Sequence, residues 1–299
     1  MLQNYSHPTG QSQTMILSFH PCFDTDVQII LGDRKLDSTI RESIQKATAI
    51  ILPQACTQDL YNICANSTAR MFPNYYARIK YPGKIGQSRM FREFRFSHPR
   101  TLRWHGVEDF KEACPSSDTP PQDLPFLIKE NMSHEAEGIF LIENNKTLNE
   151  ALDNLAIRER SGQKGFISQT YVPCGGDVLR AVVIGKRIIT YWKRPGKPGQ
   201  KITTISRGAI IDHDWQLDLQ EKGKAQARLL SDKTGINLAA IDFIFPLAEK
   251  DPEPLILEIN YYFGRRGLGG SENYYRRLYE AIQDWLEEVG LDPESVNLI

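Results

Sequence analysis

The sequence predicts an α/β protein in which a small N-terminal α/β lobe precedes two α+β lobes. Three observations predict this class. One is a continuous apolar run, TAIILP at 48–53, which is typical of a parallel strand buried on both faces. A second is the set of segments with apolar residues at helical spacing that lie between such runs. The third is that short runs rich in Val, Ile, Tyr and Phe dominate from residue 166 onward, which is the composition of β-strands.

The overall composition is that of an ordinary soluble protein. The 299 residues suffice for about two structural units, and they are 40% apolar and 24% charged. Lys and Arg number 36 against 37 Asp and Glu, so the net charge gives no argument for a nucleic-acid or membrane partner. No apolar run approaches the roughly 18 residues that a membrane-spanning helix needs. Residues 1–14 are polar and lack an apolar core, so we expect a loose tail and no secretory signal.

The cysteines indicate a reducing compartment. Their number is odd and no two of them form a Cys-x-x-Cys pair, which argues against a disulfide framework and against a zinc knuckle. We therefore expect free structural thiols in a cytoplasmic protein. The five cysteines are Cys22, Cys56, Cys64, Cys114 and Cys174.

Residues 15–95 are predicted to form the N-terminal lobe. The pattern from 15 to 51 is strand, helix, strand, and the helix has a candidate capping residue at Asp37 or Ser38. A second helix is predicted over 57–72. Strands and helices that alternate in this order are typical of a parallel sheet covered by helices.

Two α+β lobes are predicted to follow. In the central lobe, 96–170, the short strands PFLIKE and GIFLI precede a helix for which Thr147 and Glu150 offer a capping box. The C-terminal lobe, 171–299, contains several strands, a helix closed by Gly235 and a final amphipathic helix.

An oxygen-rich cluster is predicted where two strands of the C-terminal lobe pair. Asp242 interrupts the apolar strand AIDFIFP, and Glu258 and Asn260 share one face of the strand LEIN because side chains alternate along a strand. The short connection between the strands favours a hairpin, in which Asp242 would lie across from Glu258. Carboxylate and amide oxygens suit a hard cation such as Mg²⁺, whereas zinc prefers His or Cys. A solvated strand face with chance acids is the plainer alternative.

Basic residues that could bind phosphate occur at several points of the chain. Lys129 ends an apolar strand and Lys84 stands between two Gly residues, although a lysine in either setting, taken alone, is more often a solvated surface residue. Arg180 lies inside an apolar strand, so its guanidinium needs a partner. Arg265 and Arg266 lie in a Gly-rich turn, where they could clamp a substrate carboxylate or form a solvated basic turn.

Taken in order, these segments resemble an ATP-grasp carboxylate–amine ligase of the RimK-type, glutathione-synthetase-like branch. The resemblance runs from about Lys84 to the C-terminus and depends on the order and spacing of several short motifs. Lys84 stands fifteen residues before the Pro-x-Thr of HPRT. PFLIKE resembles the family's second lysine strand, ISQTYV its adenine hinge, and DVLRAVVIG its Asp-Ile-Arg strand. SRG resembles its His-Arg-Gly, and AIDFIF and LEIN resemble its metal strands.

The resemblance implies two lobes that clasp ATP together with Mg²⁺, or alternatively Mn²⁺. It implies that the two lysines bind phosphate and that the hinge and a following Asp contact adenine and ribose. It also implies that the acidic cluster binds metal and that arginines stabilise phosphate or an acyl intermediate. The phosphate lysines are Lys84 and Lys129, and the adenine and ribose contacts are Gln169, Thr170, Tyr171 and Asp177. The metal ligands are Asp242, Glu258 and Asn260, and the stabilising arginines are Arg180, Arg194 and Arg207. The implied reaction joins a carboxylate to an amine through an acyl phosphate.

Four departures from the family pattern bear on turnover and substrate choice. The loop after the second lysine, ENMSHEAEG, is poor in Gly, the hinge has Thr170 where Glu is usual, and Thr204 stands where Asn is expected. These three put the turnover rate in question. The residues after the metal strand read YYFGRRG where the family runs to Pro-Gly, which we expect to change substrate choice.

Two other functions stay open at this point. An ATP-binding module without ligase turnover fits the Gly-poor loop. A protein- or nucleic-acid-binding module fits the segment 75–103, where eight basic residues are interleaved with aromatic ones. An acidic protein or peptide suits that segment better than nucleic acid does. The identity of the acid and the amine does not follow from the sequence, nor does the oligomeric state, a homo-oligomer included.

Overall fold

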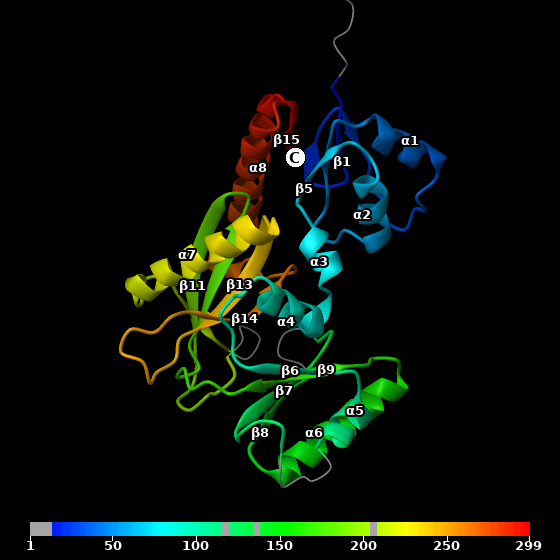
Figure 1. The fold of residues 1–299 in the computed structure, drawn as a ribbon. Helices are drawn as coiled ribbons and strands as arrows, with labels where there is room; N and C mark the ends of the chain where they lie inside the picture. Colours follow the sequence, from blue (N-terminus) through cyan, green and yellow to red (C-terminus); the bar gives the residue numbers. More distant parts are fainter. Residues whose placement is uncertain (1–13, 115–119, 134–137, 204–207) are drawn as a thin grey trace, which may run out of the picture. The chain divides into compact units, whose positions relative to one another are not determined.

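The structure is a computed structural model that describes residues 14–114, 120–133, 138–203 and 208–299 (Figure 1).

The chain forms two compact units. Unit 1 contains the residues up to Pro73 together with Tyr275–Ile299, and unit 2 contains Asn74–Tyr274. The lobe boundaries at residues 95 and 170 stay a prediction. In the part of the chain that the structure describes, no helix is long and apolar enough to cross a membrane.

A four-stranded parallel sheet lies at the centre of unit 1 and confirms the predicted start of strand, helix, strand. Its order is β3-β1-β4-β5, and every neighbouring pair is parallel. The residues of β1 and β4 are all buried, as expected for strands covered on both faces. The elements are β1 (Ile16–Ser18), β3 (Val27–Gln28), α1 (Ser38–Lys46), β4 (Ala49–Ile51), α2 (Gln58–Ala65) and β5 (Arg70–Phe72).

Two helix ends in unit 1 differ in how well the sequence predicted them. Asp37 caps α1, as predicted, because its carboxylate accepts the backbone N–H of Ile40 at 3.0 Å. The second half of the helix predicted over 57–72 is wrong, because α2 ends at Ala65 and β5 follows. The Ser67 hydroxyl donates to a carbonyl of the last helical turn, which is the local bonding that competes with helix continuation.

The end of the chain completes unit 1. β15 (Asn297–Leu298) pairs antiparallel with β2 (Phe23–Asp24). The final helix, α8 (Ser271–Glu288), was predicted, and its Trp285 ring packs on Phe72 with the ring centroids 5.6 Å apart. A division by sequence order could not show that the last residues return to the first unit.

Unit 2 begins with two helices, α3 (Tyr76–Lys80) and α4 (Gly83–Glu93). One face of α4 is buried, and Lys84, Ser88 and Phe91 lie on it at helical spacing. A lysine on the buried face of a helix needs a functional or electrostatic reason.

The first sheet of unit 2 has four antiparallel strands in the order β6-β9-β7-β8. Helices α5 and α6 cover one of its faces, and buried aromatic and aliphatic side chains fill the space between (Figure 1). The elements are β6 (Thr101–Trp104), α5 (Val107–Ala113), β7 (Phe126–Glu130), β8 (Ile139–Ile142), α6 (Asn145–Arg160) and β9 (Phe166–Thr170).

Helix α6 begins earlier than the sequence predicted. The Asn144 side chain accepts the backbone N–H of Thr147 at 3.0 Å, and the Thr147 hydroxyl accepts the backbone N–H of Asn144 at 3.2 Å. The capping box is therefore Asn144 with Thr147, and the predicted pair of Thr147 with Glu150 is wrong. Asn and Thr are both good caps, and the earlier one adds helical residues.

The second sheet of unit 2 has five antiparallel strands in the order β12-β11-β10-β13-β14. Helix α7 (Leu217–Thr234) packs on it and ends at Gly235, as predicted, with Gly235 in the left-handed conformation (φ 73°). The strands are β10 (Val178–Ile184), β11 (Arg187–Arg194), β12 (Ile210–Asp212), β13 (Leu238–Ile244) and β14 (Leu255–Asn260). The predicted hairpin is confirmed, because β13 pairs with β14 and Asp242 lies opposite Glu258.

Alternation along the strands gives this second sheet two different faces. Leu179, Trp192 and Phe243 lie side by side in the register and face α7, where a side chain on Gly223 would meet Leu179 at 2.2 Å. Arg180 is the next residue along β10 and therefore faces the other way. We call that other side the charged face, and the candidate site lies on it.

Candidate functional site

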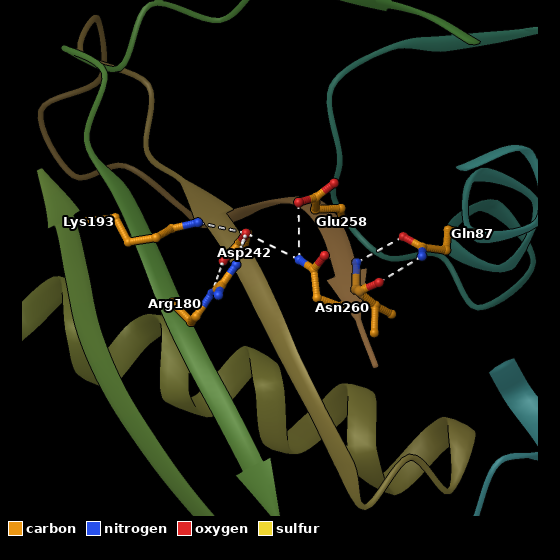
Figure 2. A network of polar contacts seen from close by, with 7 residues as sticks. Gln87, Arg180, Lys193, Asp242, Glu258 and Asn260 are labelled. Atoms are coloured by element: carbon orange, nitrogen blue, oxygen red, sulfur yellow. Dashed lines mark hydrogen bonds and ion pairs between the residues drawn. The ribbon is translucent and has the colours of Figure 1, made fainter. Parts of the chain in front are cut away.

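A buried ion cluster lies on the charged face of the second sheet (Figure 2). Arg180 stands directly opposite Asp242, and its Nε and Nη2 donate to Oδ1 and Oδ2 of that carboxylate, both at 2.8 Å. Lys193 donates from Nζ to Oδ2 of Asp242, also at 2.8 Å. Bidentate pairing of this kind fixes both the position and the plane of the carboxylate. The cluster is therefore a fixed arrangement of two cations around one acid.

Lys193 is a site residue that the sequence analysis missed. Its side chain is buried, and it follows Tyr191 and Trp192 along β11. Tyr191 is the register partner of Arg180, so Lys193, two residues further, had to share the face of Arg180. Arg194, to which the resemblance gives a role at phosphate or an acyl intermediate, is the next residue along β11, so its side chain projects to the opposite face, on which α7 packs.

Burial and ion pairing compete at each group of the cluster. Burial opposes ionisation of Asp242, but Arg180 and Lys193 outweigh it and hold the pKa of this carboxyl well below its usual value. Burial also favours the neutral form of Arg180, but Asp242 outweighs that and raises the pKa of the guanidinium. At Lys193 burial prevails over the attraction of Asp242, with help from the positive charge of Arg180, and the pKa of the amine is lowered. The cluster thus has a firmly ionised acid and an amine that loses its proton more easily than a surface lysine.

The three predicted metal ligands lie together on this face. Asn260 donates from Nδ2 to Asp242 Oδ2 at 3.3 Å and to Glu258 Oε1 at 3.1 Å. An electropositive group between two carboxylates relieves their repulsion, which is also what a bound cation would do. Among the described residues, no group of three His, Cys, Asp or Glu side chains could hold a metal ion. A cation here would therefore depend on the amide oxygen of Asn260 as well as on the two acids.

Both predicted phosphate lysines approach the same region. Burial lowers the pKa of the Lys129 amine to about 8, the negative charges of Glu258 and Asp242 oppose this, and the positive charge of Lys84 adds to it. Burial also lowers the pKa of the Lys84 amine, again against the negative charge of Glu258. Charges influence one another to this degree only over short distances. The fold therefore brings amines from α4 and the first sheet toward the acids of the second sheet.

Each lysine amine has an acceptor within the described chain. Lys129 donates from Nζ to Gln169 Oε1 at 2.6 Å, and Gln169 donates from Nε2 to Thr101 Oγ1 at 3.0 Å. Lys84 donates from Nζ to the backbone oxygen of Ser133 at 2.7 Å. A small cavity lies beside them and is lined by Lys84 and Gln169 among others. A phosphate bound here would have to replace these acceptors.

The other two hinge residues lie apart from the ion cluster. Thr170 accepts a hydrogen bond from Gln122 at 3.2 Å, and the Lys201 amine lies 5.9 Å from the ring centre of Tyr171. Their assignment to adenine stays a prediction.

The structure does not bring Asp177 and Arg194 to the cluster. Asp177 precedes Arg180 by three residues, and this odd number puts it on the opposite side of the strand. There Arg194 lies 3.5 Å from Asp177 and 3.1 Å from Asp212, and its guanidinium stacks on Trp215 with 4.0 Å to the ring centroid. These contacts give both residues partners away from the ion cluster, and their assignments to ribose and to phosphate or an acyl intermediate stay predictions.

Arg265 and Arg266 lie in the turn that follows β14. The Arg265 guanidinium lies 4.6 Å from the ring centroid of Tyr274 and donates to Ser271 Oγ at 3.3 Å. Arg266 is exposed and begins the short turn η2 (Arg266–Leu268). Arg207, which was assigned to phosphate, lies outside the described residues.

The basic and aromatic segment 75–103 contributes several buried rings to unit 2, whereas five of its eight basic residues are exposed. Several of its rings are at most 6% exposed, so they cannot stack on nucleic-acid bases. Arg78 lies over rings of the same unit, 5.0 Å from the centre of Tyr75 and 4.7 Å from that of Tyr262. The most buried rings are Tyr75, Tyr81, Phe91 and Phe96.

Sequence comparison identifies the family. The profile of the RimK-like ATP-grasp domain matches residues 97–275, which is more than half of the chain. The chain belongs to the RimK-like ATP-grasp family. The resemblance found in the motifs is thereby confirmed for this RimK-like protein.

Known relatives match part of the RimK-like protein. It is 25% identical over 163 residues to the probable alpha-L-glutamate ligase 2 of Hahella chejuensis, which covers 54% of this chain and 49% of the relative. It is 26% identical over 147 residues to the probable alpha-L-glutamate ligase of Alkalilimnicola ehrlichii, which covers 48% of this chain and 44% of the relative. The chain spans about half the length of the curated relatives it matches.

Solved structures with the same fold are more distant in sequence. A RimK domain ATP-grasp protein from Sphaerobacter thermophilus has a TM-score of 0.55 at 12% identity, covering 78% of this chain and 80% of that one. D-Alanine-D-alanine ligase from Helicobacter pylori has a TM-score of 0.56 at 16% identity, covering 78% of this chain and 71% of that one. At such identities the likeness concerns the fold alone, and it confirms the predicted ATP-grasp fold.

Proposed function

We propose that this RimK-like ATP-grasp protein is an ATP- and Mg²⁺-dependent ligase that joins a carboxylate to an amine. The names of the two relatives, both probable alpha-L-glutamate ligases, make L-glutamate the first substrate to test. Mn²⁺ is the alternative ion. The ligase is preferred over a nucleic-acid-binding module because four of the six aromatic rings in segment 75–103 are buried.

One observation carries the proposal: lysines of α4 and of the first sheet converge on the acids of the second sheet. Glu258 acts electrostatically on both Lys84 and Lys129, although the three residues come from α4, β7 and β14. Among the described residues, neither Lys84 nor Lys129 forms a salt bridge with Glu258, and amines and carboxylates that converge without such pairing suit a metal-bound polyphosphate. A purely structural cluster would have no need for two buried lysines beside the existing pair of Arg180 and Asp242.

The donor set fits a hard divalent cation. Asp242, Glu258 and Asn260 offer only oxygen ligands, and the two acids are close enough for one amide nitrogen to donate to both. To act as a ligand, the Asn260 amide would have to turn so that its oxygen, in place of Nδ2, faces the two acids. These three residues would hold the ion.

Bound Mg–ATP would supply the phosphoryl group that turns the substrate carboxylate into an acyl phosphate, which an amine then converts into an amide and phosphate. The lysine amines of the chain, Lys84 and Lys129, bind and orient the phosphates by point-charge attraction. Arg180 and Lys193 keep Asp242 ionised and fix its plane. Arg265 and Arg266, in the turn after β14, are candidates for the substrate carboxylate.

The decisive experiment measures phosphate release from Mg–ATP by the purified protein. L-Glutamate and pools of other carboxylates are offered with pools of amines and short peptides, and product masses identify the amide. Release that requires both an acid and an amine supports the ligase. Tight nucleotide binding without release in any pool would mean an ATP-binding module without turnover and would overturn the ligase.

The metal assignment is tested with Glu258→Ala. We expect this variant to remain folded and to lose metal-dependent turnover, because the two oxygen ligands that remain cannot hold the ion in place. Glu42→Ala, on an exposed position of α1, is the matched control and should keep full activity. Full activity in Glu258→Ala would falsify the assignment.

A further inference from the structure

The side chain of Gln87 is bonded twice to the backbone of a metal strand. Its Nε2 donates to the carbonyl oxygen of Ile259 and its Oε1 accepts the N–H of Ile259, both at 2.8 Å (Figure 2). Ile259 is the residue between Glu258 and Asn260. The contact therefore fixes the backbone on which two of the three candidate metal ligands stand.

This arrangement replaces a missing neighbouring strand. Among the described strands β14 is the outer one of the second sheet, so the N–H and carbonyl of Ile259 on its free edge have no strand partner there. The primary amide of Gln87 offers one donor and one acceptor side by side, which is what a paired strand would offer. A second bond holds the same edge, since the Ile256 N–H donates to the Ser97 carbonyl at 2.9 Å.

Gln87 also connects the strand to a phosphate lysine. It lies on α4 three residues after Lys84, so the two side chains project from neighbouring positions on one helix. Both line the same small cavity. A rigid helix thereby sets the distance between the Lys84 amine and the Glu258 carboxylate.

We propose that Gln87 is a positioning residue that holds Glu258 and Asn260 in the orientation needed to bind the divalent cation next to Lys84. It does not touch the substrate itself. The proposal rests on the proposed function, because it assumes that these side chains bind a metal–nucleotide complex. Groups that orient metal ligands typically change metal affinity by about 10- to 100-fold when they are removed.

The experiment compares Gln87→Leu with Gln220→Leu. Gln220, on α7, is buried and also donates from Nε2 to two backbone oxygens, those of His213 and Trp215, at 2.8 and 3.1 Å. The two variants lose similar side-chain-to-backbone bonds, but only the bonds of Gln87 hold β14. Mn²⁺ is the probe, and its half-saturating concentration in the presence of ADP is measured by electron paramagnetic resonance together with the melting temperature.

We expect Gln87→Leu to raise the half-saturating Mn²⁺ concentration about tenfold or more. Gln220→Leu should lower the melting temperature and leave the half-saturating Mn²⁺ concentration unchanged. Excess Mn²⁺ should restore turnover in Gln87→Leu but not in Glu258→Ala. An unchanged Mn²⁺ half-saturation in Gln87→Leu, with a fall in melting temperature like that of Gln220→Leu, would overturn the positioning role alone. If the unchanged protein binds no Mn²⁺–ADP, the proposed function falls and this role falls with it.

Gln87→Glu keeps the test decisive if Gln87→Leu does not fold. The new carboxylate can still accept the Ile259 N–H, but it faces the Ile259 carbonyl with an oxygen and loses the donated bond. We expect the same rise in Mn²⁺ half-saturation at a smaller loss of stability. An unaltered value in a folded Gln87→Glu protein would contradict the proposal.

Discussion

The Arg180 guanidinium holds both carboxylate oxygens of Asp242 at 2.8 Å, across two neighbouring strands of one sheet. Lys193 adds a second cation to the same carboxylate. Buried ion clusters are seldom the most stable way to fill a protein interior, because desolvation cancels much of the attraction. Apolar side chains of equal volume often stabilise as well or better. The cluster therefore calls for a functional explanation, and stability measurements can test that view.

Removing the acid alone should be far more damaging than removing all three charges. In Asp242→Ala the buried charges of Arg180 and Lys193 lose their partner, and we expect the free energy of unfolding to fall by about 3–5 kcal/mol. The triple variant Arg180→Met, Lys193→Met, Asp242→Leu should lose less than this and should have no turnover. Urea denaturation and phosphate release measure the two properties.

An exposed ion pair provides the comparison for these variants. Lys111 and Glu108 are 3.3 Å apart on the surface of α5, and Glu108→Ala should change the stability little, because water screens the pair. A triple variant that is less stable than Asp242→Ala would show that the cluster serves to stabilise the fold.

Two neighbouring cations on β11 should have opposite roles. We expect Lys193→Met to lower kcat/KM by roughly 10²- to 10³-fold, because it removes a charge that fixes Asp242 on the charged face. Arg194→Met should leave kcat/KM within a few-fold of the unchanged protein. It should lower the melting temperature, since Arg194 stacks on Trp215 and pairs with Asp212. Steady-state kinetics and thermal melting of both variants decide this, and the reverse assignment of the two effects would refute the face argument.

The positions of the candidate ligands on β13 and β14 could be predicted because their signal is local. Asp242 interrupts an apolar run, and Glu258 and Asn260 are two residues apart, so alternation alone puts them on one face. Alternation could not show which of Lys193 and Arg194 lies on the charged face, because the two residues are adjacent and both are cationic. That choice needs the register between strands. Pairing of Tyr191 with Arg180 supplies that register, and it is a contact between strands.

Gln87 and parts of the fold could not be predicted either, because they depend on contacts or competing bonds that a local sequence pattern does not show. The sequence around Gln87 shows only a polar residue, because its partner Ile259 is 172 positions away. The predicted helix over 57–72 failed where local bonding of Ser67 ends it, and the capping box failed because Asn144 and Thr147 compete for the same role. The strands and the hairpin of the second sheet were predicted well, because continuous apolar runs specify them.

Nucleotide binding should weaken at alkaline pH through Lys129. Burial lowers the pKa of its amine to about 8, and a phosphate prefers the protonated form. Above pH 8 binding must therefore take up a proton, and the affinity for ADP should fall by up to about tenfold per pH unit. Lys129→Met should bind more weakly and lose this contribution to the slope. Calorimetry between pH 7 and about 9.5, in buffers of different ionisation enthalpy, measures both the affinity and the proton uptake.

The stability of the free protein should change with pH in the opposite direction. The folded-state pKa of Lys129 lies below its ordinary value of 10.5, so between about pH 8 and 10.5 the unfolded chain binds more protons than the folded one. The free energy of unfolding therefore gains from this group as pH rises through that window. Lys129→Met should lack the gain, and a ligand affinity that rose with pH would contradict the assignment.

The turn after β14 should be intolerant of a single methyl group at Gly267. An added Cβ would lie 2.2 Å from Cζ of the Tyr191 ring, and Tyr191 is fully buried beside Arg180 in the register. Either the ring or the turn must move, so we expect Gly267→Ala to lower the free energy of unfolding by about 1–3 kcal/mol and to lower turnover. Gly264→Ala, three residues earlier in the same loop, meets no atom within 4 Å and should be close to neutral in both respects. Equal behaviour of the two variants in urea denaturation and phosphate release would show that the Tyr191 contact does not support the site.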